Sequence, residues 1–113
     1  MSKAADSQVL ERLYATIRAR KGASAKTSYT ASLFAGGKAR IARKLGEEGL
    51  EAVLATQAGD RKGLVSESAD VLYHLLVAWA DAGIAPGKVW AELVRREGTS
   101  GIEEKKSRAR KRG

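Results

Sequence analysis

Five acidic side chains occur in two short segments, each with the spacing of a helical face: Glu47, Glu48 and Glu51 in the first, Glu67 and Asp70 in the second. At 100° per residue, the first three fall in one arc of a helix beside its apolar stripe, and the second pair shares a face. Carboxylates gathered in this way repel one another and raise one another's pKa, so they favour a bound cation. Oxygen ligands select hard ions. The pattern therefore predicts a Mg²⁺ site, with Mn²⁺ as the alternative ion.

Two helices joined by a tight turn would position these acids. Helical periodicity extends over residues 38–56 and again over 61–82, with Gly59 as a helix stop and Asp60 as the next N-cap. Glu51 precedes the turn by about as many residues as Glu67 follows it, so an antiparallel hairpin brings both acidic segments to one level. We therefore expect the carboxylates to converge.

The remaining segments are also helical in pattern, and strand-like alternation is lacking. Residues 7–20 carry an apolar stripe, residues 28–34 form a short helical turn, and Pro86 opens a helix that ends near Gly98. Residues 71–80 are apolar nearly all round and must be covered on several sides, which is difficult in so small a chain. We predict an all-α bundle of four to five helices, completed by dimerisation, with one domain over residues 1–108.

Charge and composition limit the alternatives. The formal charge is +8, but the six basic residues near the C-terminus account for most of it and leave +2 for the rest: Lys105, Lys106, Arg108, Arg110, Lys111 and Arg112. Residues 109–113 therefore predict a disordered basic tail. A basic helical nucleic-acid binder is the alternative of a different class, although no helix combines a basic stripe with interleaved aromatic residues. The chain has no cysteine and no apolar run that could span a bilayer, which favours a cytoplasmic protein without a membrane or a specific nucleic-acid partner.

Several segments resemble a known enzyme family. Residues 47–51 read E-E-x-x-E and residues 67–70 read E-x-x-D, which resembles the signature of the all-α MazG-like nucleoside triphosphate pyrophosphohydrolases. The segments SYT (28–30), KLGEE (44–48), DVLYHLL (70–76) and SGIEEKKSR (100–108) resemble, more narrowly, the phosphoribosyl-ATP pyrophosphatases. The likeness extends over residues 10–108. It implies a cytoplasmic homodimer that hydrolyses phosphoribosyl-ATP to phosphoribosyl-AMP and pyrophosphate, the second step of histidine biosynthesis.

The resemblance also suggests a role for each candidate residue. We expect Glu48, Glu51, Glu67 and Asp70 to bind Mg²⁺, which would activate a water molecule for attack at the α–β phosphate linkage. Glu47 is the candidate catalytic base, or else supports the metal ligands. The basic side chains within the family-like segments are the candidate phosphate contacts: Lys44, Lys105 and Arg108. Tyr29 is a candidate substrate contact.

Other residues have simpler interpretations. We expect His74 to be a hydrogen-bonded histidine of the core or of a subunit interface, and Trp79 and Trp90 to make packing contacts. Gly49 departs from the helix formers expected within the acidic motif, and close packing or a local bend would explain it. The nearest functional alternative is a house-cleaning MazG-like pyrophosphohydrolase that acts on ordinary or damaged nucleoside triphosphates. It would share the metal site and differ in the substrate pocket.

Overall fold

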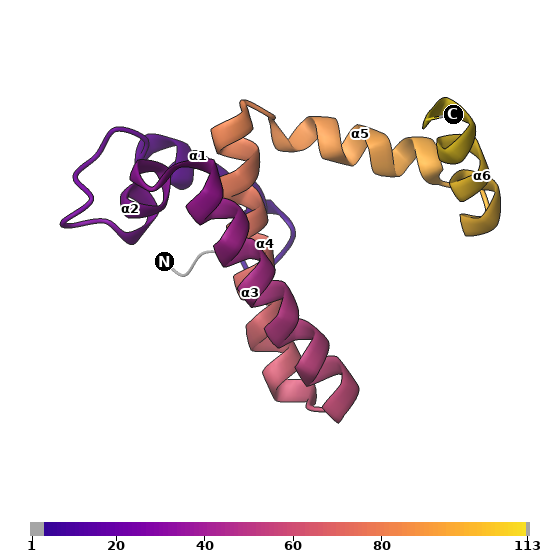
Figure 1. Ribbon diagram of the computed structural model, residues 1–113, viewed down its shortest axis with the longest axis horizontal. Coiled ribbons are helices and arrows are strands. Elements are labelled where there is room, and N and C mark those ends of the chain that lie inside the picture. Colours follow the sequence, from indigo (N-terminus) through magenta and orange to yellow (C-terminus); the bar gives the residue numbers. More distant parts are fainter. Residues whose placement is uncertain (1–3, 113) are drawn as a thin grey trace.

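In the described part of the chain, six helices make up a small bundle, which includes a projecting helical hairpin, and a helical arm that leaves the bundle (Figure 1). A computed structural model describes residues 4–112, and no strand occurs among them. The helices are α1 (Gln8–Ala19), α2 (Tyr29–Ala35), α3 (Gly37–Ala58), α4 (Arg61–Ala82), α5 (Pro86–Arg96) and α6 (Gly101–Arg112). The predicted all-α class is confirmed. None of the helices in this range has the length and apolar character needed to cross a membrane.

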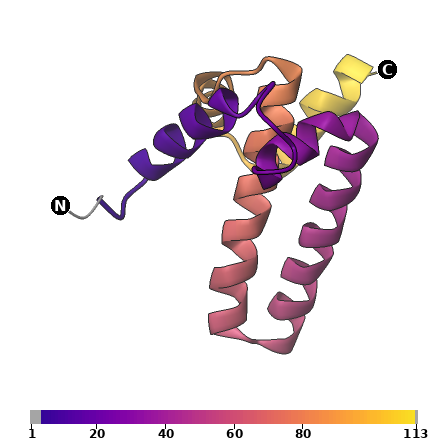
Figure 2. The ribbon, with the colours of Figure 1, turned by 90° about the vertical axis from the view of Figure 1, so that its left-hand side faces the viewer.

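The turn between α3 and α4 forms where the sequence predicts it. Gly59 ends α3 with a left-handed φ of 68°, a conformation that glycine adopts without strain. Asp60 then caps α4, because its carboxylate accepts a hydrogen bond of 2.9 Å from the backbone N–H of Gly63. The two helices consequently run antiparallel and side by side, as both views show (Figures 1 and 2).

Helix α4 lies at the centre of the fold and packs against α1, α2 and α3. The largest fully buried side chains come from α1, α2 and α4: Ile17, Leu33, Leu76 and Val77. These three helices therefore provide much of the cover that the apolar segment 71–80 requires. Leu72 is nevertheless 41% exposed, so one side of α4 stays open to solvent.

Helices α5 and α6, together with the residues between them, form an arm, residues 86–112, that leaves the bundle at the end of α4 (Figure 1). Trp90 attaches the base of the arm. Its ring packs edge-on against Trp79 with centroids 5.8 Å apart, and its Nε1–H donates a 2.9 Å hydrogen bond to Glu11. The predicted packing role of both tryptophans is confirmed. Beyond Trp90, Leu93 and Val94 are exposed.

Helix α6 differs from the sequence-based expectation, in which residues 109–113 were a disordered tail. The helix continues to Arg112, and only Gly113 of that segment lies outside the described residues. Ser100 accepts a hydrogen bond from the backbone N–H of Glu103 and so caps the first turn. Acidic residues in that turn and basic residues later in the helix also match the helix dipole, which a reading of net charge alone overlooks.

Candidate active site

Three carboxylates from the α3–α4 hairpin converge. Glu48 of α3 and Glu67 and Asp70 of α4 each offer an oxygen atom, and these atoms all lie within 4.8 Å of one another. Glu48 and Glu67 are half-buried, whereas Asp70 is exposed. The structure thus brings together three of the four predicted metal ligands.

The electrostatics of this cluster favour a cation. Burial raises the pKa of the Glu67 carboxyl group, and the negative charges of Asp70, Glu48 and Glu51 raise it further. Glu51 is exposed and lies outside the group of three oxygen atoms, yet it is close enough to add to the repulsion. A hard divalent ion would relieve this repulsion through oxygen ligands alone. The donor set therefore fits magnesium.

Glu47 and Lys44 lie at the edge of the cluster. The Nζ of Lys44 is 3.5 Å from a carboxylate oxygen of Glu47, one helical turn away. The Lys44 side chain is 30% exposed and that of Glu47 is 50% exposed, so both can reach a ligand from the solvent side. The pair thus places one cation and one further carboxylate on the same helix as Glu48.

An aromatic group on α2 and α4 adjoins Asp70. Tyr73 and His74 follow Asp70 by three and four residues and share its helix face, and Tyr29 lies against both rings, 6.4 Å from each between centroids. The Thr30 hydroxyl hydrogen-bonds to that of Tyr73. The Tyr29 ring remains 51% exposed and is therefore available to a ligand. The sequence analysis did not identify Tyr73 as a residue of the site, although its position three residues after Asp70 places both on one helix face.

His74 plays the structural part that its apolar surroundings predict. It is 5% exposed, and its Nδ1 lies 2.8 Å from the backbone carbonyl oxygen of Asp70. Because a carbonyl can only accept, Nδ1 carries the proton in this hydrogen bond. The ring thereby braces the turn of α4 that carries Asp70, and the prediction of a hydrogen-bonded core histidine is confirmed.

Gly49 lies in the acidic motif without a packing reason inside the chain. A Cβ atom built there would meet no other atom within 4 Å, and α3 continues through it as regular helix. Close packing within the protomer, one of the two expected explanations, is therefore wrong. The other, a local bend, does not interrupt the helix, because α3 is continuous through Gly49.

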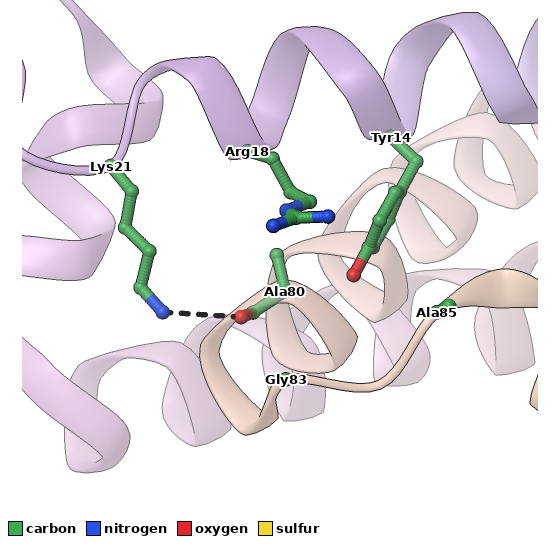
Figure 3. A pocket seen from close by; sticks show the side chains of 6 residues that line it. All are labelled: Tyr14, Arg18, Lys21, Ala80, Gly83 and Ala85. Atoms are coloured by element: carbon green, nitrogen blue, oxygen red, sulfur yellow. Dashed lines mark hydrogen bonds between the residues drawn. The ribbon is translucent and has the colours of Figure 1, made fainter.

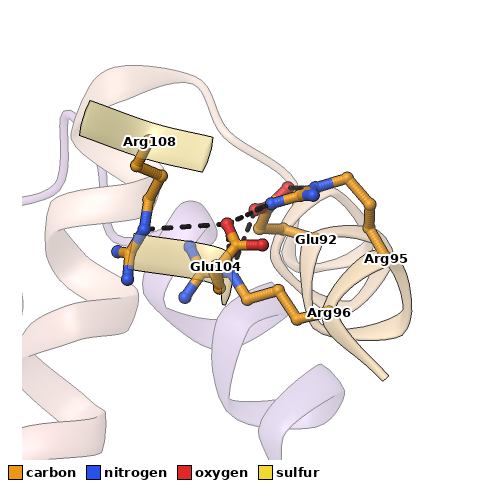
Figure 4. Close-up of polar contacts among 5 residues, drawn as sticks. All are labelled: Glu92, Arg95, Arg96, Glu104 and Arg108. Atoms are coloured by element: carbon orange, nitrogen blue, oxygen red, sulfur yellow. Dashed lines mark hydrogen bonds and ion pairs between the residues drawn. The ribbon is translucent and has the colours of Figure 1, made fainter. Parts of the chain in front are cut away.

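The two predicted phosphate contacts on α6 lie far from the acidic cluster of the same chain. Figure 1 shows α6 at the outer end of the arm, well away from the α3–α4 hairpin. Lys105 is exposed. Arg108 contributes to a group of ion pairs around Glu104, at 3.6 Å between Nε and the carboxylate (Figure 4). The structure therefore does not bring Lys105 and Arg108 together with the carboxylates within one protomer.

Glu104 is the centre of this arm cluster. It is 5% exposed and accepts a 2.5 Å hydrogen bond from Arg95, which holds the pKa of its carboxyl group below the ordinary value. Arg95 and Arg96 also donate to Glu92, and these bonds lower its pKa to about 2. The cluster ties α6 to α5 and fixes which side of α6 faces inward.

A separate cavity of about 240 Å³ lies at the other end of α4, between α1 and the turn after Gly83 (Figure 3). The Nζ of Lys21 donates a 3.3 Å hydrogen bond to the carbonyl oxygen of Ala80, and the Tyr14 hydroxyl donates one of 2.7 Å to Ile84. Arg18 also lines the cavity. These cations face the carbonyl end of α4, where positive charge stabilises a helix, so the cavity has a structural explanation.

Comparison with known proteins identifies the family. Residues 10–97, which include both acidic segments, match the family model of phosphoribosyl-ATP pyrophosphohydrolases. The chain belongs to this family. A phosphoribosyl-ATP pyrophosphatase of Paramagnetospirillum magneticum is 60% identical over 108 residues, which cover 96% of this chain and 99% of that relative. One of Azospirillum brasilense is 60% identical over 100 residues, 88% of this chain and 90% of the relative. The resemblance inferred from the sequence motifs is confirmed.

Proposed function

We propose that this chain is a Mg²⁺-dependent enzyme that hydrolyses phosphoribosyl-ATP to phosphoribosyl-AMP and pyrophosphate in the cytoplasm, as the second step of histidine biosynthesis. The observation that carries the proposal is the convergence of Glu48, Glu67 and Asp70 from two helices in a member of this family. The names of its relatives support the substrate.

Each residue of the site has a part in the proposed reaction. Glu48, Glu67 and Asp70 would hold the ion, with Glu51 as a further ligand. Bound Mg²⁺ would supply charge neutralisation for the phosphates and acidify a water molecule. The exposed carboxylate of Glu47 would accept the proton of the attacking water at an Oε atom. The Nζ of Lys44 would bind a phosphate oxygen, and the exposed ring of Tyr29 would contact the substrate.

Pyrophosphate release from phosphoribosyl-ATP, with and without Mg²⁺, tests the activity. We expect Glu67→Gln to lower turnover about 100-fold or more, because it removes one charge where the metal and phosphates must be stabilised. Glu97→Gln removes a charge from an exposed carboxylate of the arm and is the matched control. Full turnover in Glu67→Gln with unchanged helical content would contradict the metal assignment.

A substrate comparison separates the proposal from its nearest alternative. A house-cleaning pyrophosphohydrolase would cleave dCTP, dUTP or ATP at least as well as phosphoribosyl-ATP. We expect a clear preference for phosphoribosyl-ATP, measured as kcat/KM for each nucleotide under the same Mg²⁺ concentration. The reverse preference would overturn the assigned substrate and leave the metal site in place.

The functional unit in this proposal is a homodimer. The protomer exposes 8197 Å² of surface, whereas a compact monomer of 12.1 kDa exposes about 6000 Å². Its radius of gyration, 16.3 Å, likewise exceeds the value of about 13 Å for a compact domain of this length. The excess of about 2000 Å² is of the size that stable subunit interfaces bury. Analytical ultracentrifugation at micromolar concentration tests this point.

A further inference from the structure

Arg40 of α3 is a half-buried cation without a counter-ion in its own chain. Its Nε atom is buried, and the guanidinium group makes no hydrogen bond or ion pair in the described part of the chain. Two other arginines bury an Nε without a hydrogen bond, but Arg12 donates to the carbonyl oxygen of Ala4 and Arg108 pairs with Glu104. A buried donor of a charged group is costly to leave without an acceptor. An external anion is therefore the natural partner of Arg40.

The side chain of Arg40 folds back over Gly36, the residue that joins α2 to α3. A Cβ atom at Gly36 would lie 2.2 Å from the Cδ of Arg40, so a side chain at position 36 would displace it. The glycine thus holds the arginine near the N-terminal end of α3, where the helix dipole is positive. Gly36 provides no side-chain cap, and the first turn of α3 contains no acidic residue. A bound anion would offset both positive charges.

Arg40 shares the helix face that carries the candidate active site. At 100° per residue it lies about 40° from Lys44 and about 80° from Glu48 around the axis of α3. Along the axis it precedes Glu48 by about 12 Å, and Lys44 lies midway between them. Because the side chain folds back toward Gly36, it points away from the acids. Arg40 is therefore on the surface of the site, but beyond the reach of a phosphate bound to the metal.

Helix α2 connects the aromatic group of the site with Arg40. The helix begins at Tyr29, whose exposed ring lies against Tyr73 and His74, and it ends next to Gly36. Its seven residues cover about 10 Å, and it packs against both α3 and α4. An elongated ligand that contacts the acids and the Tyr29 ring could therefore extend along α2 to Arg40.

The proposed substrate has anionic groups at two separate ends. Phosphoribosyl-ATP is, as its name states, ATP with an additional phosphoribosyl group. The base and the second ribose lie between the triphosphate and the remaining phosphate, so this phosphate needs a cation at a distance from the metal. A guanidinium group suits it, because its planar fork binds phosphate oxygens in pairs. Ordinary nucleoside triphosphates lack this second anionic end.

We propose that Arg40 binds the phosphate of the additional phosphoribosyl group and thereby selects phosphoribosyl-ATP over nucleotides without that group. The inference rests on the proposed function and names the residue that recognises its substrate. The contact is remote from the bond that breaks, so loss of Arg40 should weaken binding and leave the chemical step largely intact. Gly36 is a positioning residue in this arrangement, because it acts through Arg40.

Arg40→Gln tests the selection of the substrate. We expect kcat/KM for phosphoribosyl-ATP to fall about 10- to 100-fold, mainly through KM, because a charge-assisted contact is lost. The inhibition constant of ATP against phosphoribosyl-ATP should not change, since ATP has no group for Arg40. Arg40→Lys keeps the charge without the planar fork and should recover part of the loss. Arg43→Gln, at an exposed position of the same helix, is the matched control.

Gly36→Ala tests the geometry while the guanidinium group is retained. Gly36 has a φ of −76°, which alanine adopts without strain, so the flexible side chain of Arg40 should yield and the helices should stay folded. This variant should also lose kcat/KM for phosphoribosyl-ATP and keep its affinity for ATP. In combination with Arg40→Gln it should cause little further loss, because both changes remove one contact. Gly46→Ala, where a Cβ meets open space, is the control.

Ribose 5-phosphate tests the same contact without turnover. This probe carries the phosphoribosyl group alone, and it can be titrated against the full chain in the absence of Mg²⁺. We expect it to shift the backbone amide NMR signals at the start of α3 in the wild type and not in Arg40→Gln. Ribose without phosphate is the control and should shift neither. The titration tests Arg40 even if the wild type fails to hydrolyse phosphoribosyl-ATP, a failure that would refute the proposed function instead.

Three results would overturn the inference. The first is an equal loss of affinity for phosphoribosyl-ATP and ATP in Arg40→Gln, since Arg40 would then act on the shared triphosphate or on the fold. The second is an unchanged kcat/KM, or equal shifts with ribose 5-phosphate in Arg40→Gln and the wild type. The third is a weaker dimer of Arg40→Gln in the ultracentrifuge, which would show that a second subunit provides the anion. Thermal unfolding establishes that each variant is folded.

Discussion

The α1–α4 bundle and the α5–α6 arm are built on different physical principles. The bundle has a dry core of side chains such as Leu76 and Val77, which are 1% and 0% exposed. The outer part of the arm is held by hydrogen bonds and ion pairs around Glu104, and most of its apolar residues face solvent. Apolar packing resists small changes, whereas the ion pairs of the arm join the buried Glu104 to partly exposed arginines and are more sensitive to salt. The bundle is therefore suited to hold the acids at fixed spacing, and the arm to adapt to a partner.

Truncating one leucine in each region should show the largest difference. Leu76→Ala leaves a cavity in the core and should lower the free energy of unfolding by about 2–5 kcal/mol. Leu93 is 54% exposed, so Leu93→Ala should cost about 0.5 kcal/mol or less in an isolated protomer. Urea denaturation at several protein concentrations measures both. A cost for Leu93→Ala that grows with protein concentration would instead show that this side chain is covered in the dimer.

Substitution of Glu104 should loosen the arm and spare the bundle. Glu104→Gln removes the charge that Arg95 and Arg108 share, so the backbone amides of α6 should exchange hydrogen faster, while those of α4 should not change. Hydrogen exchange followed by mass spectrometry measures both helices at once. Equally faster exchange in α4 would mean that the arm also stabilises the bundle, so that the two regions are not independent.

Acid should act on the arm through the lowered pKa values of Glu92 and Glu104. A carboxyl group with a depressed pKa in the folded state stabilises that state above its ordinary pKa of 4.5, and this contribution is lost as the pH falls through the folded-state value. For Glu92 that value is about 2. We therefore expect α6 to detach from α5 as the pH falls from about 4.5 to 2. An NMR titration of the Glu92 and Glu104 carboxyl carbons would measure both pKa values. Midpoints near 4.5 for both groups would contradict the expectation.

Substitution of Gly49 should have the smallest effect on stability, and it tests whether a second subunit packs against α3. In a helix with open space around this position, Gly49→Ala should stabilise the chain by up to about 1 kcal/mol and leave turnover unchanged. Thermal unfolding of the variant, with Gly46→Ala as the matched control, measures this. Destabilisation by Gly49→Ala would indicate that another subunit packs against α3 at Gly49, since nothing in the same chain does.

The helical hairpin and its acids could be predicted from local rules. The short-range signals are the glycines that end the helices, Gly59 and Gly83, and the N-cap at Asp60. The helix predicted over residues 61–82 coincides with α4. The equal distances of the acids from the turn then placed them together. The helicity of α6 was missed because net charge alone gives no information about capping or about the ion pairs of Glu104.

The sequence by itself determined the all-α class, the helix boundaries around the acidic hairpin, and the family, because capping, periodicity and motifs act over a few residues. Only the tertiary structure decided which carboxylates converge to within 4.8 Å, and that Tyr73 joins Tyr29 beside them. It alone showed that Lys105 and Arg108 lie on an arm away from the acids they were expected to join. That separation depends on the direction in which α5 leaves α4. The packing of Trp79 on Trp90 sets this direction, and short-range sequence signals such as caps and periodicity do not predict a contact between these two residues.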